Sequence, residues 1–215
     1  MLVIPVGSLE QHGPHLPLDT DTRIAAEAAR RGCAGRAGVA LGPPITVGAS
    51  GEHADFPGTL SIGTRALAAC LTELGRHASG HWPAMLLVNG HGGNADAVAA
   101  AVRRLRDEGR ATAAWHVGLP GGDAHAGRFE TSIMLALAPA TVRLEAAAPG
   151  ERRPLSELLP VLRDRGVRAV SPNGVLGDPS GASAGEGERM LADLTARLRE
   201  TMDELLGATA DGSIA

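Results

Sequence analysis

The sequence predicts an α/β fold in which helices cover both faces of a central, mainly parallel sheet. Three observations lead to this prediction. Apolar, strand-like runs alternate with helix-like segments along the chain, an order typical of parallel sheets. With 215 residues and 44% hydrophobic content, the chain can bury the core of one domain spanning residues 1–215. Each main group of histidines and carboxylates directly follows a predicted strand, where open α/β sheets place their functional sites.

The predicted strands are short apolar runs that end at glycine-containing turns. Such runs are typical of strands buried on both faces of a sheet. Gly7 stops the first run and Asn89-Gly90 stops the second, because these residues break strands. We expect strands at Leu2–Val6, Met85–Val88 and Ala111–Val117.

Apolar residues at three- and four-residue spacing predict the helices. Leu67, Leu71 and Leu74 share one face of such a segment, which is the spacing of a helix packed against a core. The region 145–183 is rich in Pro and Gly, with one short helix inside it. We expect helices at Thr22–Arg31, Thr64–His77, Ala95–Glu108, Glu130–Leu137, Pro154–Arg163 and Glu186–Leu206.

Composition excludes several classes of partner. The formal net charge of −4 gives no reason to expect nucleic acid or an anionic membrane surface. No apolar run approaches the roughly 18–20 residues that a membrane span needs. Cys33 and Cys70 lack CxxC spacing and are expected to be reduced structural thiols. We therefore expect a cytoplasmic protein.

Five stretches of the chain combine glycine with histidine or carboxylate. They span residues 7–15, 19–21, 51–53, 89–94 and 122–130. Glycine allows sharp turns and close approach of the backbone to a ligand. Imidazole and carboxylate are the usual protein ligands of zinc, manganese and iron. The pattern predicts a metal-dependent active site assembled from loops.

The spacing of these residues suggests how they could share a metal centre. Glu10 and His12 are two residues apart after a strand, so in extended backbone both side chains point to the same side. Asp21 lies where a loop turns into a helix, a place from which a carboxylate can bridge two cations. His91 lies between Gly90 and Gly92 in a tight turn. Any one of these residues alone would be read as a capping or solvated residue.

Several motifs together resemble the creatininase (creatinine amidohydrolase) family. They are Val6-Gly7-Ser8-Leu9-Glu10-Gln11-His12-Gly13-Pro14-His15-Leu16-Pro17, Asp19-Thr20-Asp21-Thr22, Asn89-Gly90-His91-Gly92-Gly93-Asn94, His125-Ala126-Gly127 and Glu130-Thr131-Ser132. They cover nearly the whole chain in the family's order. The resemblance implies a three-layer α/β/α domain with a dinuclear metal site that hydrolyses amide bonds. It also implies a homo-oligomer, with a hexamer as one form.

The resemblance also implies roles for individual residues. Glu10 and His91 match ligands of one metal, His12 matches a ligand of the other, and Asp21 matches the carboxylate that bridges them. Creatininase places a further ligating Glu two residues after this His, where this chain has Gly93.

Glu130 and His125 are the candidate site residues in the second half of the chain. Glu130 is the candidate to supply the missing ligand, with capping of the following helix as the alternative. His125 matches the family's general acid/base. Ala124 replaces a carboxylate that precedes this His in creatininase, so creatinine itself is not the expected substrate.

Other segments resemble the creatininase-like peptidases of mycofactocin biosynthesis, a subgroup of the family. These segments are 48–53, 58–64, 120–123 and 174–179. Such peptidases release the modified C-terminal Val-Tyr unit of a ribosomally made precursor peptide, and the resemblance implies that substrate here. Side chains expected to contact it are Ser50, Glu52, His53, Asp123 and Arg128. For Glu52 and His53, a role as surface loop residues is an equal alternative.

The expected chemistry is hydrolysis by metal-activated water, with two divalent ions per subunit. His and carboxylate suit zinc, iron(II) and manganese alike, so the sequence does not choose among them. The segment around Ser8 lacks the Gly-x-Ser-x-Gly pattern of serine hydrolases. Two alternatives stay open: a small-molecule amidohydrolase or deformylase on the same scaffold, and a non-catalytic protein stabilised by metal.

Overall fold

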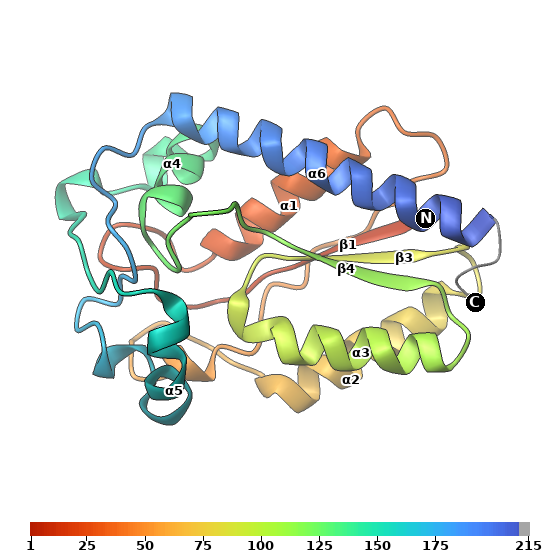
Figure 1. Cartoon of the computed structure of the whole chain (residues 1–215), viewed down its shortest axis with the longest axis horizontal. Coiled ribbons are helices and arrows are strands. Elements are labelled where there is room, and N and C mark those ends of the chain that lie inside the picture. The colour runs from red at the N-terminus through yellow and green to blue at the C-terminus, as the bar shows by residue number, and fades with distance from the viewer. Residues whose placement is uncertain (211–215) are drawn as a thin grey trace.

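A four-stranded, fully parallel sheet forms the centre of the molecule (Figure 1). The computed structural model describes residues 1–210. The strands are β1 (Leu2–Val6), β2 (Ala40–Leu41), β3 (Met85–Asn89) and β4 (Thr112–His116), in the spatial order β2-β1-β3-β4. Leu2 pairs with Ala40 on one side and with Met85 on the other, and Met85 pairs with Thr112. The predicted α/β fold with a parallel sheet is confirmed.

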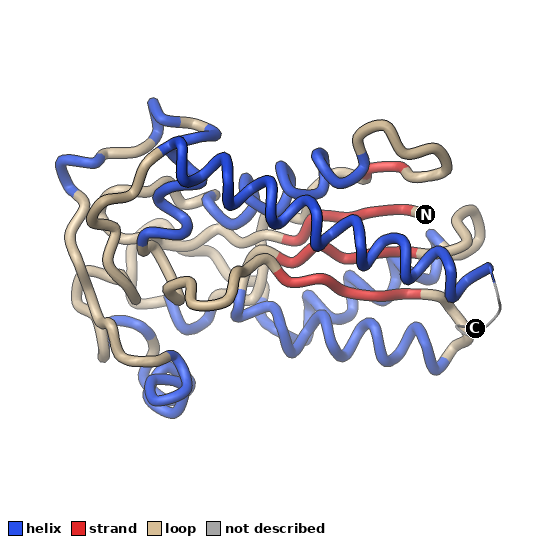
Figure 2. Tube along the Cα trace, turned by 45° about the horizontal axis from the view of Figure 1, so that its top comes forward, coloured by secondary structure: helices blue, strands red, loops and turns tan. Residues whose placement is uncertain are grey.

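Helices cover both faces of this sheet (Figures 1 and 2). Helices α1 (Thr20–Cys33), α4 (Arg128–Leu137) and α6 (Ala184–Ala210) lie on one face, and α2 (Gly63–Ala78) and α3 (Ala95–Asp107) lie on the other. Val3 and Leu86 are buried in the core on the α1, α4 and α6 side, whereas Ile4 and Leu87 are buried against α2 and α3. This alternation follows from the two-residue period of strands.

The parallel sheet brings three loops to one edge. The segments after β1, β3 and β4 all leave at the carboxyl ends of the strands, which point toward α4 and α5 (Leu155–Arg165) at the left of Figure 1. Two isolated antiparallel bridges add further segments at this edge. Leu9 bridges to Leu60, and His125 bridges to Leu176. The histidine- and carboxylate-containing loops are therefore neighbours, as the sequence predicts.

The structure adds one strand to the prediction and moves several helix ends. Strand β2 has only two residues, Ala40 and Leu41, and the second is exposed, so it has neither an apolar run nor an alternation to reveal it. Helix α1 begins at Thr20 rather than Thr22, and α4 begins at Arg128 rather than Glu130. Cys33 and Cys70 are both free cysteines. Within residues 1–210, no helix is long and apolar enough to cross a membrane.

Candidate metal centre

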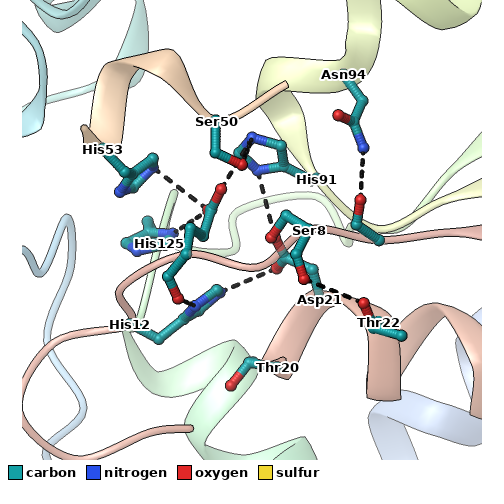
Figure 3. Close-up of polar contacts among 12 residues, drawn as sticks. Ser8, His12, Thr20, Asp21, Thr22, Ser50, His53, His91, Asn94 and His125 are labelled. Carbon is teal, nitrogen blue, oxygen red and sulfur yellow. Dashed lines mark hydrogen bonds and ion pairs between the residues drawn. The ribbon is translucent and has the colours of Figure 1, made fainter. Parts of the chain in front are cut away.

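The predicted metal ligands converge in one cluster, in which His12, Asp21, His91 and His125 lie close together (Figure 3). Glu10 and His12 come from the loop after β1, Asp21 from the first turn of α1, and His91 from the loop after β3. His125 and Glu130 come from the loop before α4 and from its first turn. Five of these six side chains are almost completely buried, those of Glu10, His12, Asp21, His91 and His125.

The Glu10 carboxylate is the most unusual group of the cluster. It is 0% exposed, and neither of its oxygens has a hydrogen-bond partner in the described part of the chain. Imidazole nitrogens surround it: His91 Nε2 lies 3.0 Å from Oε2, and His53 Nε2 lies 3.3 Å from Oε1. Burying a carboxylate that no hydrogen bond satisfies costs much free energy unless positive charge compensates it. The position suits a group that ligates a cation.

Asp21 contacts histidines from two different loops. Its Oδ1 lies 3.0 Å from His12 Nε2, and its Oδ2 lies 3.3 Å from His91 Nδ1. The Ser8 hydroxyl also donates a hydrogen bond of 2.6 Å to Oδ2. Burial acts to raise the pKa of Asp21, but His12 and His91 outweigh it and hold that pKa well below its usual value. The two oxygens of Asp21 thus face two separate imidazoles, one from each of two loops.

The potential at His12 and His91 is strongly negative. Burial acts to lower the pKa of His12, yet the carboxylates of Asp21, Glu130 and Glu10 raise it to about 10. The pKa of His91 is likewise raised well above its usual value against the effect of burial, chiefly by Glu10 and Asp21. A potential that holds protons this firmly also attracts divalent cations, which can replace those protons on the imidazole nitrogens.

Three sets of potential ligands lie within mutual coordinating reach in residues 1–210. Each residue of a set offers one nitrogen or oxygen atom, and these atoms all lie within 4.8 Å of one another. The sets share members: His12 and His125 each belong to two of them, as does Glu10. Imidazole and carboxylate together fit zinc, manganese or iron(II). The sets are Glu10–His12–Asp21, His12–His125–Glu130 and Glu10–His53–His125.

His125 is held as a neutral imidazole. Its Nε2 lies 2.8 Å from the carbonyl oxygen of Gln11 and donates its hydrogen there, which leaves Nδ1 without a proton. That Nδ1 faces Glu10 Oε1 at 3.7 Å. Burial, together with the nearby His12 and His53, holds the pKa of His125 well below its usual value. The next residue, Ala126, has a φ of 52°, a strained conformation of the kind found at functional sites.

Glu130 combines two contacts. Its Oε2 accepts a hydrogen bond of 2.6 Å from the Ala126 backbone N–H and lies 3.8 Å from His12 Nε2. Burial raises the pKa of Glu130 to about 7, although His12 acts in the opposite direction. The start of α4 is capped by another residue, since Asp123 accepts hydrogen bonds from the backbone N–H groups of Arg128 and Phe129.

A cavity of about 940 Å³ opens above the cluster. One side is lined by His91, His125 and Glu130, and the other by apolar residues of α5 and the turn that follows it. Leu155 and Leu159 of α5 are exposed on that side. The cavity has the size and mixed lining of a substrate site.

The five side chains expected to contact substrate differ in their surroundings. Glu52, His53 and Asp123 line the cavity, whereas Ser50 and Arg128 are not among its lining residues. Ser50 is fully buried, with Oγ 3.5 Å from His91 Nε2. Arg128 forms an ion pair of 2.8 Å with Glu186 on the surface. Their substrate roles stay predictions.

The family follows from comparison with known proteins. The family model "Creatinine amidohydrolase" matches residues 1–202. The chain belongs to the creatininase family. A mycofactocin precursor peptide peptidase from Mycolicibacterium smegmatis is 51% identical, over 90% of this chain and 81% of its own length. A creatinine amidohydrolase from Pseudomonas putida is 30% identical, over 89% of this chain and 84% of its own length.

Solved creatininase structures share the fold. One described as "Creatininase Mn" superposes with a TM-score of 0.77 at 26% identity, covering 95% of this chain and 90% of the other. A mutant creatininase described as "Zn-Zn type" gives a TM-score of 0.76 at 26% identity, with 95% and 90% covered. The three-layer creatininase-like fold expected from the resemblance is confirmed.

Sequence reasoning missed Gln11, which organises the histidines of this creatininase-family site. Its Nε2 lies 2.9 Å from His53 Nδ1 and 3.0 Å from the Gly174 carbonyl oxygen. An amide hydrogen donated to His53 Nδ1 places the His53 proton on Nε2, facing Glu10. Gln11 lies between two predicted ligands, and alternation along extended backbone directed attention away from it.

Asn94 is the second residue that sequence reasoning missed. Its Nδ2 donates to the Gly7 carbonyl at 2.9 Å (Figure 3). Its Oδ1 accepts a hydrogen bond of 2.8 Å from the Ala49 N–H. One buried amide thus joins the loop after β1, the segment before Ser50 and the loop after β3. Its place in the Asn89-Gly90-His91-Gly92-Gly93-Asn94 run is the only sequence signal for this role.

Proposed function

We propose that this creatininase-family protein is a dinuclear metal-dependent peptidase that releases the modified C-terminal Val-Tyr unit from the mycofactocin precursor peptide. The observation that carries the chemistry is the buried Glu10 carboxylate, which lacks hydrogen bonds and is surrounded by imidazoles below a large cavity. The substrate is supported by relatives named mycofactocin precursor peptide peptidase, which are 51% and 52% identical to this chain.

The residues of the cluster divide between two ion positions that share Asp21. Glu10, Asp21 and His91 would hold one ion, and His12, Asp21 and Glu130 would hold the other. Two divalent ions there would lower the pKa of a water molecule and polarise the scissile carbonyl. Zinc, iron(II) and manganese all suit this ligand set, and the names of solved creatininase structures include Mn and Zn.

His125 is the proposed proton carrier, working through Nδ1. Because its pKa is held below the usual value, His125 is neutral at physiological pH and begins as a proton acceptor. The hydrogen on Nε2 stays bonded to the Gln11 carbonyl, so the transferred proton enters and leaves at Nδ1. After accepting a proton from the attacking water, His125 can deliver it to the amine that leaves.

The wall formed by α5 is the proposed contact for the apolar part of the peptide. Leu155, Leu159 and Leu162 line the cavity opposite the histidines. A modified Val-Tyr unit offers an aliphatic and an aromatic group, which would bury against such side chains. Of the residues at the cavity's polar side, Glu52, His53 and Asp123 remain candidates for contacts with the peptide backbone.

A small-molecule amidohydrolase is the second candidate function. The Pseudomonas putida creatinine amidohydrolase supports it, but a cavity of about 940 Å³ lies at the upper end of the range for small-molecule sites and favours a peptide. A non-catalytic, metal-stabilised scaffold is a third possibility, and it offers no reason for the cavity to reach the cluster. A cytoplasmic homo-oligomer, with a hexamer as one form, remains part of the proposal.

One experiment separates these functions. The metal-loaded protein is incubated with the modified precursor peptide, the unmodified peptide and small cyclic amides, and products are identified by mass spectrometry. We expect release of the C-terminal dipeptide unit from the modified peptide only, abolished by a chelator. Hydrolysis of the cyclic amides alone would establish the small-molecule alternative, and no hydrolysis of any substrate with both ions bound would favour the scaffold.

A further inference from the structure

The space beside Gly93 is already filled by another residue's carboxylate. A Cβ atom added at Gly93 would lie 2.2 Å from Glu52 Oε1 and 2.4 Å from His91 Nε2. Both distances are far shorter than the contacts that Cβ atoms make with other heavy atoms in proteins. Glu52 therefore occupies the volume that a side chain two residues after His91 would need, and this is the position of the ligating Glu in creatininase.

Glu52 reaches this place from a different loop. It lies in the short 3-10 helix Gly51–His53, and its Oε1 is 3.3 Å from His91 Nε2. The same nitrogen of His91 is 3.0 Å from Glu10 Oε2. Two carboxylates thus face one imidazole nitrogen. Asn94 fixes the approach of this loop through its hydrogen bond with the Ala49 N–H.

Glu130 lies elsewhere in the cluster. Its Oε2 is next to His12 and accepts a hydrogen bond from the Ala126 backbone. Glu130 therefore belongs with the His12 end of the cluster, and Glu52 belongs with the His91 end. The Glu52 side chain is 26% exposed and lines the cavity, whereas Glu10 is fully buried.

We propose that Glu52 is a ligand of the divalent ion at the Glu10–His91 end of the cluster, in place of the carboxylate that Gly93 cannot provide. The inference rests on the two-ion site proposed above. Glu52 is assigned to the metal rather than only to the substrate, because its carboxylate contacts His91, a proposed ligand of that ion. The segment Gly51–His53 thus supplies the carboxylate that the loop after β3 lacks.

The test measures metal binding rather than turnover. Wild-type protein and Glu52→Gln are loaded with zinc, passed through a desalting column and analysed for metal per subunit. Cobalt(II) titration followed by visible absorption then gives the affinity of each position. Glu52→Gln keeps the shape of the side chain, and circular dichroism verifies that the variant is folded. Asp55→Asn, an exposed carboxylate three residues away, is the matched control.

We expect two ions in the wild type and in Asp55→Asn, and one tightly bound ion in Glu52→Gln. Removing a residue that only hydrogen-bonds to a metal ligand already lowers metal affinity by about 10- to 100-fold. Loss of a direct ligand should therefore lower the affinity of one ion position by more than about 100-fold. Two ions bound at wild-type affinity in Glu52→Gln would overturn the assignment and leave the two-ion site intact. A wild type that binds fewer than two ions would overturn the two-ion site and the role of Glu52 with it.

Discussion

At the scale of single residues, Asp21 is the group shared by the two proposed ion positions. Its two oxygens face His12 and His91, which lie at opposite ends of the cluster. A carboxylate between two cations also reduces their mutual repulsion. Removing it therefore affects two positions, whereas removing Glu10 or His12 should impair one position more than the other.

We predict that Asp21→Ala loses both ions. Asp19→Ala is the control, because Asp19 lies in the same segment but pairs with Arg23 at the surface. Metal analysis of both purified variants decides the question. Retention of two ions per subunit in Asp21→Ala would show that Asp21 does not bridge.

For His125→Ala we predict normal metal content and retained substrate binding. Turnover should fall by roughly 100- to 10,000-fold, the usual range for loss of a general acid/base. The loss should be smaller for a substrate whose leaving group needs no proton. Steady-state kinetics with both substrates and metal analysis provide the measurement. A variant that loses metal would make His125 a ligand, a role that its place in two ligand sets would also permit.

For Glu130→Gln we predict lower metal occupancy at the His12 end of the cluster. A glutamine oxygen can still accept the Ala126 hydrogen bond, so the local structure is kept while the negative charge is lost. Asp123→Asn is the contrasting variant, since Asp123 caps α4; it should lose about 1 kcal/mol of stability and keep both ions. Full metal content in Glu130→Gln with only a lower melting temperature would return Glu130 to a structural role.

At the scale of elements, the loop after β3 shows how closely backbone and ligands pack. We predict that Gly93→Ala lowers metal affinity by at least about 10-fold, because its methyl group would meet Glu52 Oε1, His91 Nε2 and the Ala49 carbonyl oxygen. Gly92→Ala should bind metal normally, since a methyl group there meets nothing within 4 Å. Equal affinities in a cobalt titration of the two variants would contradict this account of the loop.

The elements that could be predicted from sequence are those with strong local patterns. Strands β1 and β3 are continuous apolar runs, and α2 and α3 repeat apolar residues at helical spacing. Strand β2 has no such pattern, because two residues cannot show one. The start of α4 depends on Asp123, which lies five residues before Arg128, and such a long-range cap has no short sequence signature.

In the site, too, residues in local motifs could be predicted, whereas contacts between distant loops could not. Glu10, His12, Asp21 and His91 were predicted because motifs place them directly after strands, and the structure brings them together. The position of Glu52 beside His91 was not predicted, because it depends on how the segment 48–53 folds back over Gly93. Contacts between loops that are distant in sequence are set by tertiary packing, and a single sequence does not display them.

At the scale of the whole molecule, the proposed metal centre links both halves of the chain. Its residues come from the loop after β1, from α1, from the loop after β3 and from α4. Ions bound there would stabilise only the folded chain, by about 2.7 kcal/mol when the free ion is at 100 times its dissociation constant. We predict that a chelator lowers the melting temperature by about 5–10 °C.

Scanning calorimetry with and without chelator provides this measurement, and Asp21→Ala is the control. The variant should melt at one temperature in both conditions, because it has no ions to lose. An unchanged melting temperature of the wild type after chelation, with metal analysis verifying removal, would mean that the centre contributes little to the stability of the fold.

The hydrogen bond from Gln11 to the Gly174 carbonyl has a consequence for how this sequence can change. Gly174 has a φ of +80°, and a Cβ atom there would lie 1.9 Å from Gln11 Oε1. A side chain at 174 would therefore displace the Gln11 amide that contacts His53 Nδ1, although Gly174 is not among the residues that line the cavity. We therefore expect substitutions at these two positions, which are separated by most of the chain, to have non-additive effects.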